Sequence, residues 1–315
     1  MITQNNYCAE PCLIITYKRS ANCMSLIDSL LSQGCRRMYV AIDFGNTNDV
    51  IASQSEFSFL EVKYRDKFEV FQVWRRGENL GVAVSVITAI DWFFKNEERG
   101  VILEDDLIIS TDFLKFMSFG LQELEANKNV FSISASNFFS DEKFENFFST
   151  YFIGWGWGTW RDRWNNAKMN FLSDTLPPPF TFNEFYNFWS VGAYRCKVGI
   201  VDTWDLELTK FIRDNKFVNV IAARNLVSNI GFDQYSTNTK ISAFPLGIPI
   251  EELTLECYKF MNLEVDSNFD RKLEKQVFRI RFRHKFLFFV YRQWHLTAAF
   301  KNPPLVKRLQ KVLIP

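Results

Sequence analysis

Short apolar runs alternate with amphipathic stretches along the first 140 residues of the chain. Continuous apolar runs predict buried strands, whereas apolar positions three and four residues apart predict helices that cover one face of a sheet. The predicted strands span residues 12–16, 38–43, 57–62, 100–103 and 130–135, and the predicted helices span residues 20–34, 81–95 and about 111–126. Consecutive βα units of this kind build an open, doubly wound, mostly parallel sheet, so the sequence predicts an α/β fold.

The second half of the chain is less regular and rich in aromatic residues. Residues 154–160 place three tryptophans among three glycines, which favours a loop that brings backbone and indole faces close to a ligand. Flat aromatic faces suit sugar rings, and a tight aromatic corner of the core is the alternative interpretation. Residues 181–184 follow three prolines, have the pattern of a capping box and predict a helix through Trp189.

Three adjacent carboxylates, Glu104, Asp105 and Asp106, follow the apolar run 100–103. Like charges this close raise one another's pKa unless a cation neutralises them, and hard oxygen ligands favour Mg²⁺ or Mn²⁺. The alternative is a solvated acidic turn before the next helix, which Ser110 and Asp112 would cap. The run of carboxylates is therefore a candidate metal site.

Further candidates lie at strand ends and in a second acidic cluster. In a doubly wound sheet, ligands bind at the carboxyl ends of the strands, where Thr16 and Asp43 also fall. Residues 201–207 contain three more carboxylates, about a hundred residues after the first cluster. Two separated carboxylate clusters fit two roles, one in metal binding and one in proton transfer.

Composition and missing motifs exclude several classes of protein. The only two histidines, His284 and His295, lie near the C-terminus, so the rest of the chain has no imidazole for a Ser-His hydrolase. No G-x-S-x-G elbow, Walker loop or Rossmann glycine fingerprint occurs. The six cysteines form no C-x-x-C pair, which favours free thiols in a reducing cytoplasm. Residues 1–6 are polar and no apolar run reaches roughly 20 residues, so we expect neither a secretory signal nor a spanning helix.

The formal charge of +1 conceals an uneven distribution. Residues 271–315 carry twelve Lys or Arg and one acid, whereas residues 1–270 carry 25 bases and 35 acids. Bulky apolar residues interleave with the bases, a composition that suits an anionic membrane surface. Packing of this basic segment against the acidic body is the alternative, and nucleic-acid binding is disfavoured because no recognisable module accompanies the charge. We therefore expect a cytoplasmic protein that is peripheral at the inner face of the cytoplasmic membrane.

Several segments in combination resemble nucleotide-sugar-dependent glycosyltransferases of the GT-A fold, in particular bacterial enzymes related to the N-acetylglucosaminyltransferase I group. The resemblance spans about residues 11–240 and rests on residues 16–19, 41–43, 79–81, 102–106, 134–137, 154–160, 204–205 and 225–231. One departure is Glu207, because many members of the family have an aromatic residue two places after the catalytic base.

The resemblance implies a role for each matching residue. Asp205 is expected to be the catalytic base, and Asp106 the ligand of Mn²⁺ or Mg²⁺. The expected donor-binding residues are Thr16, Arg19, Asp43, Asn79, Glu104 and Asp105, and the candidates for contacts with the sugar or the acceptor are Asn137, Trp155 and Trp157. The implied domains are a GT-A catalytic domain at 1–255, with a donor half at about 1–137 and an acceptor half at about 138–255, and a basic, helical, aromatic segment at 256–315.

The implied function is metal-dependent, inverting transfer of a sugar from a nucleoside diphosphate, with UDP expected, to a glycan or lipid-linked glycan of the bacterial surface. A sugar nucleotidyltransferase would share the sheet and the carboxylates, but usually carries a glycine-rich phosphate loop near its N-terminus that is missing here. A non-catalytic sugar-binding or scaffold protein on the same fold is the third hypothesis.

Overall fold

The computed structural model describes residues 9–45, 55–139, 146–173, 184–231, 248–254, 257–260, 264–280 and 307–308. The strands are β1 (Cys12–Thr16), β2 (Arg37–Ile42), β3 (Val70–Arg75), β4 (Arg99–Glu104), β5 (Leu107–Ile109), β6 (Val130–Ser134), β7 (Phe147–Ser149), β8 (Trp157–Trp160), β9 (Val218–Ile221) and β10 (Val227–Asn229). The α-helices are α1 (Ser20–Ser32), α3 (Leu60–Tyr64), α4 (Val82–Asn96), α5 (Phe113–Glu123), α6 (Arg161–Leu172), α7 (Glu184–Lys197), α8 (Asp205–Asp214) and α9 (Ser267–Lys272).

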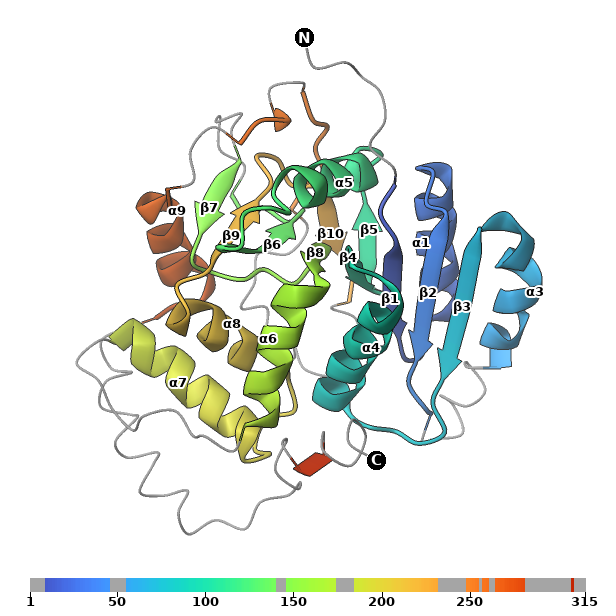
Figure 1. Ribbon diagram of the computed structural model, residues 1–315, viewed down its shortest axis with the longest axis horizontal. Coiled ribbons are helices and arrows are strands. Elements are labelled where there is room, and N and C mark those ends of the chain that lie inside the picture. Colours follow the sequence, from blue (N-terminus) through green and yellow to red (C-terminus); the bar gives the residue numbers. More distant parts are fainter. Residues whose placement is uncertain are drawn as a thin grey trace.

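A single eight-stranded sheet organises the fold, in the order β3-β2-β1-β4-β8-β6-β9-β7 (Figure 1). Strands β3, β2, β1 and β4 are mutually parallel, as are β6 and β9. Strand β8 is antiparallel to both β4 and β6, and β7 is antiparallel to β9 at the edge. A separate antiparallel ribbon pairs β5 with β10.

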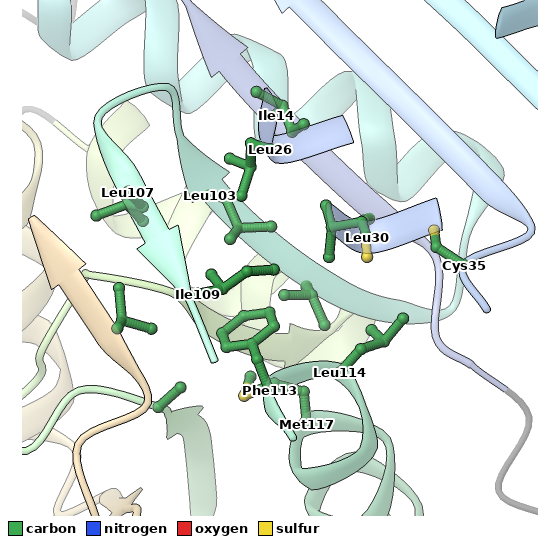
Figure 2. Close-up of a cluster of buried hydrophobic side chains, with 14 of the residues drawn as sticks. Ile14, Leu26, Leu30, Cys35, Leu103, Leu107, Ile109, Phe113, Leu114 and Met117 are labelled. Carbon is green, nitrogen blue, oxygen red and sulfur yellow. The ribbon is translucent and has the colours of Figure 1, made fainter. Parts of the chain in front are cut away.

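Alternate residues of the central strands face two hydrophobic layers. Ile14 of β1 and Leu103 of β4 pack against side chains of α1 and α5 (Figure 2). Leu13 and Ile102, one position earlier in each strand, pack against α4 and α6 on the other face. Because both faces are covered, these strands read as continuous apolar runs rather than as an alternating pattern. The predicted α/β class and doubly wound sheet are confirmed.

The predicted strand at 57–62 is wrong. This segment forms a 3₁₀ turn, η1 (Glu56–Phe59), followed by α3, and the third strand is β3. Phe57, Leu60 and Tyr64 are fully buried, whereas Phe59 and Val62 are 68% and 85% exposed. Burial at positions i, i+3 and i+7 is the helical period. Strand β3 escaped detection because it lies at the sheet edge and has no fully buried position.

The predicted caps differ from the observed ones. No side chain caps α1, and the hydroxyl of Ser20, its first residue, donates to Glu56. Asp112 precedes α5 but accepts a 3.1 Å hydrogen bond from the backbone N–H of Leu253 instead of capping the helix. Helix α7 begins at Glu184 and passes through Trp189, as expected, and the predicted cap at 181–183 lies outside the described residues.

Part of the predicted C-terminal segment packs into the body. Helix α9 continues into a π-helical turn, η4 (Leu273–Val277), whose first residue is fully buried against Tyr151 and Trp189. Val265 also forms a parallel bridge with Phe148 of β7. Residues 281–306, which contain much of the basic and aromatic sequence, lie outside the described residues. In the part of the chain that is described, no helix is both long enough and apolar enough to cross a membrane.

Candidate functional site

A pocket of about 390 Å³ opens where the carboxyl end of β4 meets the start of α8. Ile102 pairs with Trp157, so the chain that precedes the antiparallel β8 runs past the end of β4 and brings Trp155 to the pocket. The lining residues are Val82, Glu104, Asp106, Phe138, Phe152, Ile153, Gly154, Trp155, Phe188, Trp189, Thr203, Trp204, Asp205, Leu206, Thr209, Asn229, Gly231, Val277 and Phe278. Carboxylates and aromatic rings therefore share one cavity.

Asp105 ties the end of β4 to the loop after β1. Its Oδ2 accepts hydrogen bonds from the Thr16 hydroxyl at 2.5 Å and from the Tyr17 backbone N–H at 3.3 Å. Its Oδ1 accepts one from Nη1 of Arg19 at 3.3 Å. Burial raises the pKa of Asp105, and the bonds from Thr16 and Arg19 oppose that rise. Asp105 is only 6% exposed, so in this structure it organises the loop instead of facing the pocket.

Asp106 faces the pocket and is held from two sides. Its Oδ2 accepts a 3.4 Å hydrogen bond from Nη1 of Arg19, whose Nη2 donates to the carbonyl oxygen of Gly231. The backbone N–H of Ile230 donates to the Asp106 carbonyl oxygen at 2.8 Å. A Cβ on Gly231 would overlap with Oδ2 of Asp106. The close approach of the chain after β10 therefore fixes the position of this carboxylate and leaves no room for a Cβ at residue 231.

Glu104 links the two acidic clusters. Burial is the largest cause of a rise in the pKa of Glu104 to about 8. The charges of Asp106, Asp105 and Asp205 act in the same direction, and the charge of Arg19 opposes them. An electrostatic effect of Asp205 on Glu104 requires the two side chains to be close, although a hundred residues separate them in the sequence. The structure thus brings the two predicted clusters to one pocket.

Asp205 is the first residue of α8, where the helix dipole favours a negative charge. Its Oδ1 accepts hydrogen bonds from the Thr203 hydroxyl at 2.5 Å and from the Leu206 backbone N–H at 3.0 Å. Burial raises the pKa of the Asp205 carboxyl, and these hydrogen bonds oppose the rise. A carboxylate oriented in this way, with a raised pKa, is suited to accept a proton.

Glu207 points away from the pocket and belongs to the packing of α7 on α8. It is 1% exposed and lies 3.1 Å from Nζ of Lys197 in α7. Lys197 also donates to the carbonyl oxygens of Asn170 and Ser173 at the end of α6. Glu207 is therefore part of a buried ion pair that joins α6, α7 and α8.

A second group of predicted donor-binding residues lies at the carboxyl end of β2. Asp43 accepts hydrogen bonds from the backbone N–H groups of Phe44 and Leu80, and burial raises its pKa. Asn79 is exposed and donates to the carbonyl oxygen of Phe44 at 2.9 Å. Neither side chain lines the pocket. Because β2 is parallel to β1, these residues lie at the same edge of the sheet as the pocket, but outside it.

Two predicted sugar contacts do not reach the pocket. Trp157 is 1% exposed inside β8, and Asn137, also 1% exposed, donates from Nδ2 to the carbonyl oxygens of Ala222 and Ala223. All four residues of β8 are buried because the strand lies between β4 and β6, so Trp157 packs in the core. Trp155, by contrast, lines the pocket and packs edge-to-face on Phe138 with centroids 5.2 Å apart. The sugar-contact prediction therefore fits the position of Trp155 alone.

Sequence reasoning missed several residues of the site. Arg76 is 8% exposed beside Asp43, stacks over Trp74 at 4.1 Å, and donates to the carbonyl oxygen of Ser85. Burial lowers its pKa to about 10. Arg76 directly follows β3, and because that strand was not predicted, its place at a strand end gave no signal. Phe188 and Phe278 also line the pocket, but no local pattern separates such residues from the core.

The carboxylates suit a divalent cation that arrives with a phosphate ligand. Within the described residues, no group of three or more His, Cys, Asp or Glu could hold a metal by itself. Mg²⁺ commonly binds through one or two carboxylates together with substrate phosphates rather than in a protein cage. Glu104 and Asp106 supply hard oxygen donors on one wall of the pocket, so their chemistry fits that mode of binding.

Comparison with known proteins gives distant similarities. No known protein family matches the sequence, and no curated protein matches it. A mannosyltransferase from Pyrobaculum calidifontis, solved with GDP-Man and Mn²⁺, is 11% identical, with 66% of this chain and 69% of that chain covered and a TM-score of 0.36. A UDP-glucose pyrophosphorylase solved with UDP-glucose is 11% identical over 67% of this chain and 89% of that chain, with a TM-score of 0.36.

A third solved structure, a putative glucose-1-phosphate thymidylyltransferase from Bacillus anthracis in complex with sucrose, is 11% identical. The similarity covers 58% of this chain and 82% of that chain, with a TM-score of 0.33. Similarities this distant carry no argument about activity.

Proposed function

We propose that this chain is a glycosyltransferase of the GT-A fold that takes its sugar from a nucleoside diphosphate. The observation that carries the proposal is the meeting of two carboxylate clusters in one pocket, with Glu104 and Asp106 on one side and Asp205 on the other. Transfer of a glycosyl group needs stabilisation of a departing diphosphate and removal of a proton from the incoming hydroxyl. The pocket offers separate residues for the two tasks.

Residues at the carboxyl ends of β1, β2 and β4 would bind the sugar donor. Arg19, whose guanidinium reaches the pocket edge at Asp106, is suited to contact a phosphate. Asp43 and Asn79 would contact the nucleoside, and Asp105 with Thr16 holds the loop that receives it. Glu104 would contact the donor sugar. Asp106 would hold Mn²⁺ or Mg²⁺, which when bound stabilises the leaving diphosphate as a Lewis acid.

The acceptor half falls to Asp205 and the aromatic wall. Asp205 would remove the proton from the acceptor hydroxyl as that oxygen attacks the anomeric carbon opposite the diphosphate. The two hydrogen bonds on Oδ1 keep the carboxylate oriented for this step. A single displacement of this kind inverts the anomeric configuration. Trp155 offers a flat apolar surface on which a sugar ring can stack.

The biological setting that we propose is synthesis of a bacterial surface polysaccharide. The basic and aromatic sequence beyond residue 280 suits an anionic membrane surface, where a lipid-linked glycan acceptor would be found. The proposed acceptor is therefore a glycan or a lipid-linked glycan.

A panel of nucleotide sugars tests the proposal with the full-length chain. Release of nucleoside diphosphate would be followed with Mn²⁺, with Mg²⁺ and with chelator, in the presence and absence of glycan acceptors. Metal-dependent diphosphate release supports the glycosyltransferase. Exchange of pyrophosphate into the nucleotide sugar would instead identify a nucleotidyltransferase, and binding without turnover of any donor would identify a sugar-binding protein.

A further inference from the structure

Arg308 lies against the start of α4 although it is 226 residues further along the chain than Val82, the first residue of that helix. Its Nη1 donates to Oδ1 of Asp202 at 3.0 Å, and its Nη2 donates to the carbonyl oxygen of Leu80 at 2.5 Å. The Arg308 and Asp202 side chains are 18% and 29% exposed. One guanidinium therefore bridges two loops that are distant in sequence, the one before α4 and the one before α8.

Asp202 in turn caps α4 from outside the helix. The backbone N–H groups of Val82 and Ala83 donate to its two carboxylate oxygens at 2.9 and 3.3 Å. The residue at the N-cap position of α4 is Gly81, which has no side chain to satisfy these donors. Gly81 has a φ of 73°, and a Cβ there would overlap with both Asp202 and Arg308. Arg308, Asp202 and the start of α4 thus form one closely packed unit.

The pocket is lined by residues that directly follow both points held by Arg308. Val82 lines it from the side of α4, and residues 203–206 line it directly after Asp202. Asp205 is only three residues from the carboxylate that Arg308 holds. Phe278, from the described part of the C-terminal segment, lines the same pocket. Late residues of the chain therefore contribute both to the pocket wall and to the attachment of the loop that carries Asp205.

We propose that Arg308 is a positioning residue for the transfer reaction, which holds the loop carrying Asp205 against the start of α4. The inference rests on the proposed glycosyltransferase function. Arg308 is not among the residues that line the pocket, and it acts by fixing the distance between the candidate base and the wall formed by Val82. Small displacements of a base reduce turnover steeply, whereas they leave donor binding on the β4 side largely unaffected.

The first measurement is independent of activity. Hydrogen exchange in the full-length chain would be compared between wild type, Arg308→Ala and the control Arg224→Ala. Arg224 pairs with Glu251 at 3.0 Å with exposures of 17% and 24%, close to those of the Arg308 pair. Arg308→Ala should increase exchange in residues 80–83 and 203–206 and leave β6 unchanged. Equal exchange in wild type and Arg308→Ala at both loops would overturn the proposal.

The second measurement separates positioning from stability. With a donor that the wild type turns over, Arg308→Ala should lower kcat by about tenfold to a hundredfold, while Kd for the nucleoside diphosphate stays within about twofold. Arg308→Lys keeps the charge, but a lysine ammonium cannot reach both acceptors as the planar guanidinium does. The kcat of Arg308→Lys should therefore lie between those of the wild type and Arg308→Ala. Arg224→Ala should retain wild-type kcat. A kcat for Arg308→Ala equal to that of Arg224→Ala would overturn the positioning role even if exchange increases.

A double-mutant cycle tests the route of the effect. Asp202→Asn keeps one oxygen for the Val82 amide but removes the negative charge that pairs with Arg308, so it should reproduce the kinetic defect. Combining it with Arg308→Ala should add little, because both changes break one interaction. Additive losses of kcat would show that Arg308 acts independently of its ion pair with Asp202. If the wild type turns over no donor, the proposed function fails, and hydrogen exchange alone still decides whether Arg308 holds the loop.

Discussion

The indole rings of Trp157 and Trp204 stack with centroids 5.7 Å apart and planes 23° from parallel. Trp204 directly precedes Asp205, and Phe152 packs edge-to-face on both indoles. Trp157, which the sequence predicted to contact a sugar, instead packs in the core, where it supports the segment that carries the candidate base. Trp157 and Trp155 have different roles because β8 begins at Trp157, whereas Trp155 precedes the strand, beyond Gly156 with its φ of 64°.

Truncation of these two tryptophans should separate their roles. Trp157→Ala leaves a large cavity in the core and should lower the free energy of unfolding by about 3–5 kcal/mol. Trp155→Ala, at the half-buried pocket wall, should have a much smaller effect on stability and should raise KM for the acceptor. Denaturant unfolding and steady-state kinetics measure the two effects. Equal destabilisation by both substitutions would contradict the assignment.

Replacing the candidate base should abolish turnover without affecting the donor. Asp205→Asn retains an oxygen that can accept from Thr203 and Leu206, so the loop should keep its conformation. Loss of the base should reduce kcat by about 10²–10⁴. The matched control is Asp214→Asn at the other end of α8, which should be near wild type. Calorimetry of nucleoside diphosphate binding should give the same Kd for all three proteins, and weakened binding in Asp205→Asn would contradict the role.

The pH dependence of activity should reflect the buried environment of Asp205. Burial raises its pKa, and the base acts in its ionised form, so kcat/KM should fall as the pH falls through that raised pKa. The raised pKa has the opposite effect on the pH dependence of the free energy of unfolding. Since the folded state binds the proton more tightly, this group's contribution to stability decreases as the pH rises above about 4. A pH profile at fixed Mn²⁺ tests the first point; an identical acid limb in the residual activity of Asp205→Asn would assign the limb to another group.

Removal of the candidate metal ligand should affect donor binding. Asp106→Ala should weaken nucleoside diphosphate binding in Mn²⁺ and should have little effect on the weaker binding in chelator, because the carboxylate acts through the cation. Asp112→Ala serves as the control, since Asp112 contacts Leu253 outside the pocket. Calorimetric titrations with and without Mn²⁺ give the four affinities. Full activity of Asp106→Ala in chelator would refute the metal assignment.

The close approach at residue 231 gives an independent test of the same carboxylate. Gly231→Ala would force Asp106 or Arg19 to move, because the added Cβ overlaps with Oδ2 of Asp106. We expect Mn²⁺-dependent affinity for the nucleoside diphosphate to fall while the melting temperature changes little. Gly77→Ala is the matched control, because a Cβ there would meet no atom within 4 Å. Equal affinities of the two variants would show that the position of Asp106 is not critical.

Much of the fold follows from local patterns. The buried strands β1, β2, β4 and β6 are continuous apolar runs, and α1, α4 and α5 show the helical period, so these elements were predicted within a few residues. The antiparallel strand β8 was not predicted, since residues 157–160 form a strand only by fitting between β4 and β6. Strand β3 was missed because an edge strand needs no continuous apolar run.

The sequence by itself determined which chemical groups are available: a run of three carboxylates after a buried strand, a second acidic segment and a tryptophan-rich loop. These are local properties, fixed by the order of residues. Only the tertiary structure decided which groups meet. It placed Glu104, Asp106 and Asp205 at one pocket, turned Trp157 into the core, and brought Arg308 to the loop before the candidate base. Such juxtapositions depend on strand order and on contacts across a hundred residues or more, which no local period encodes.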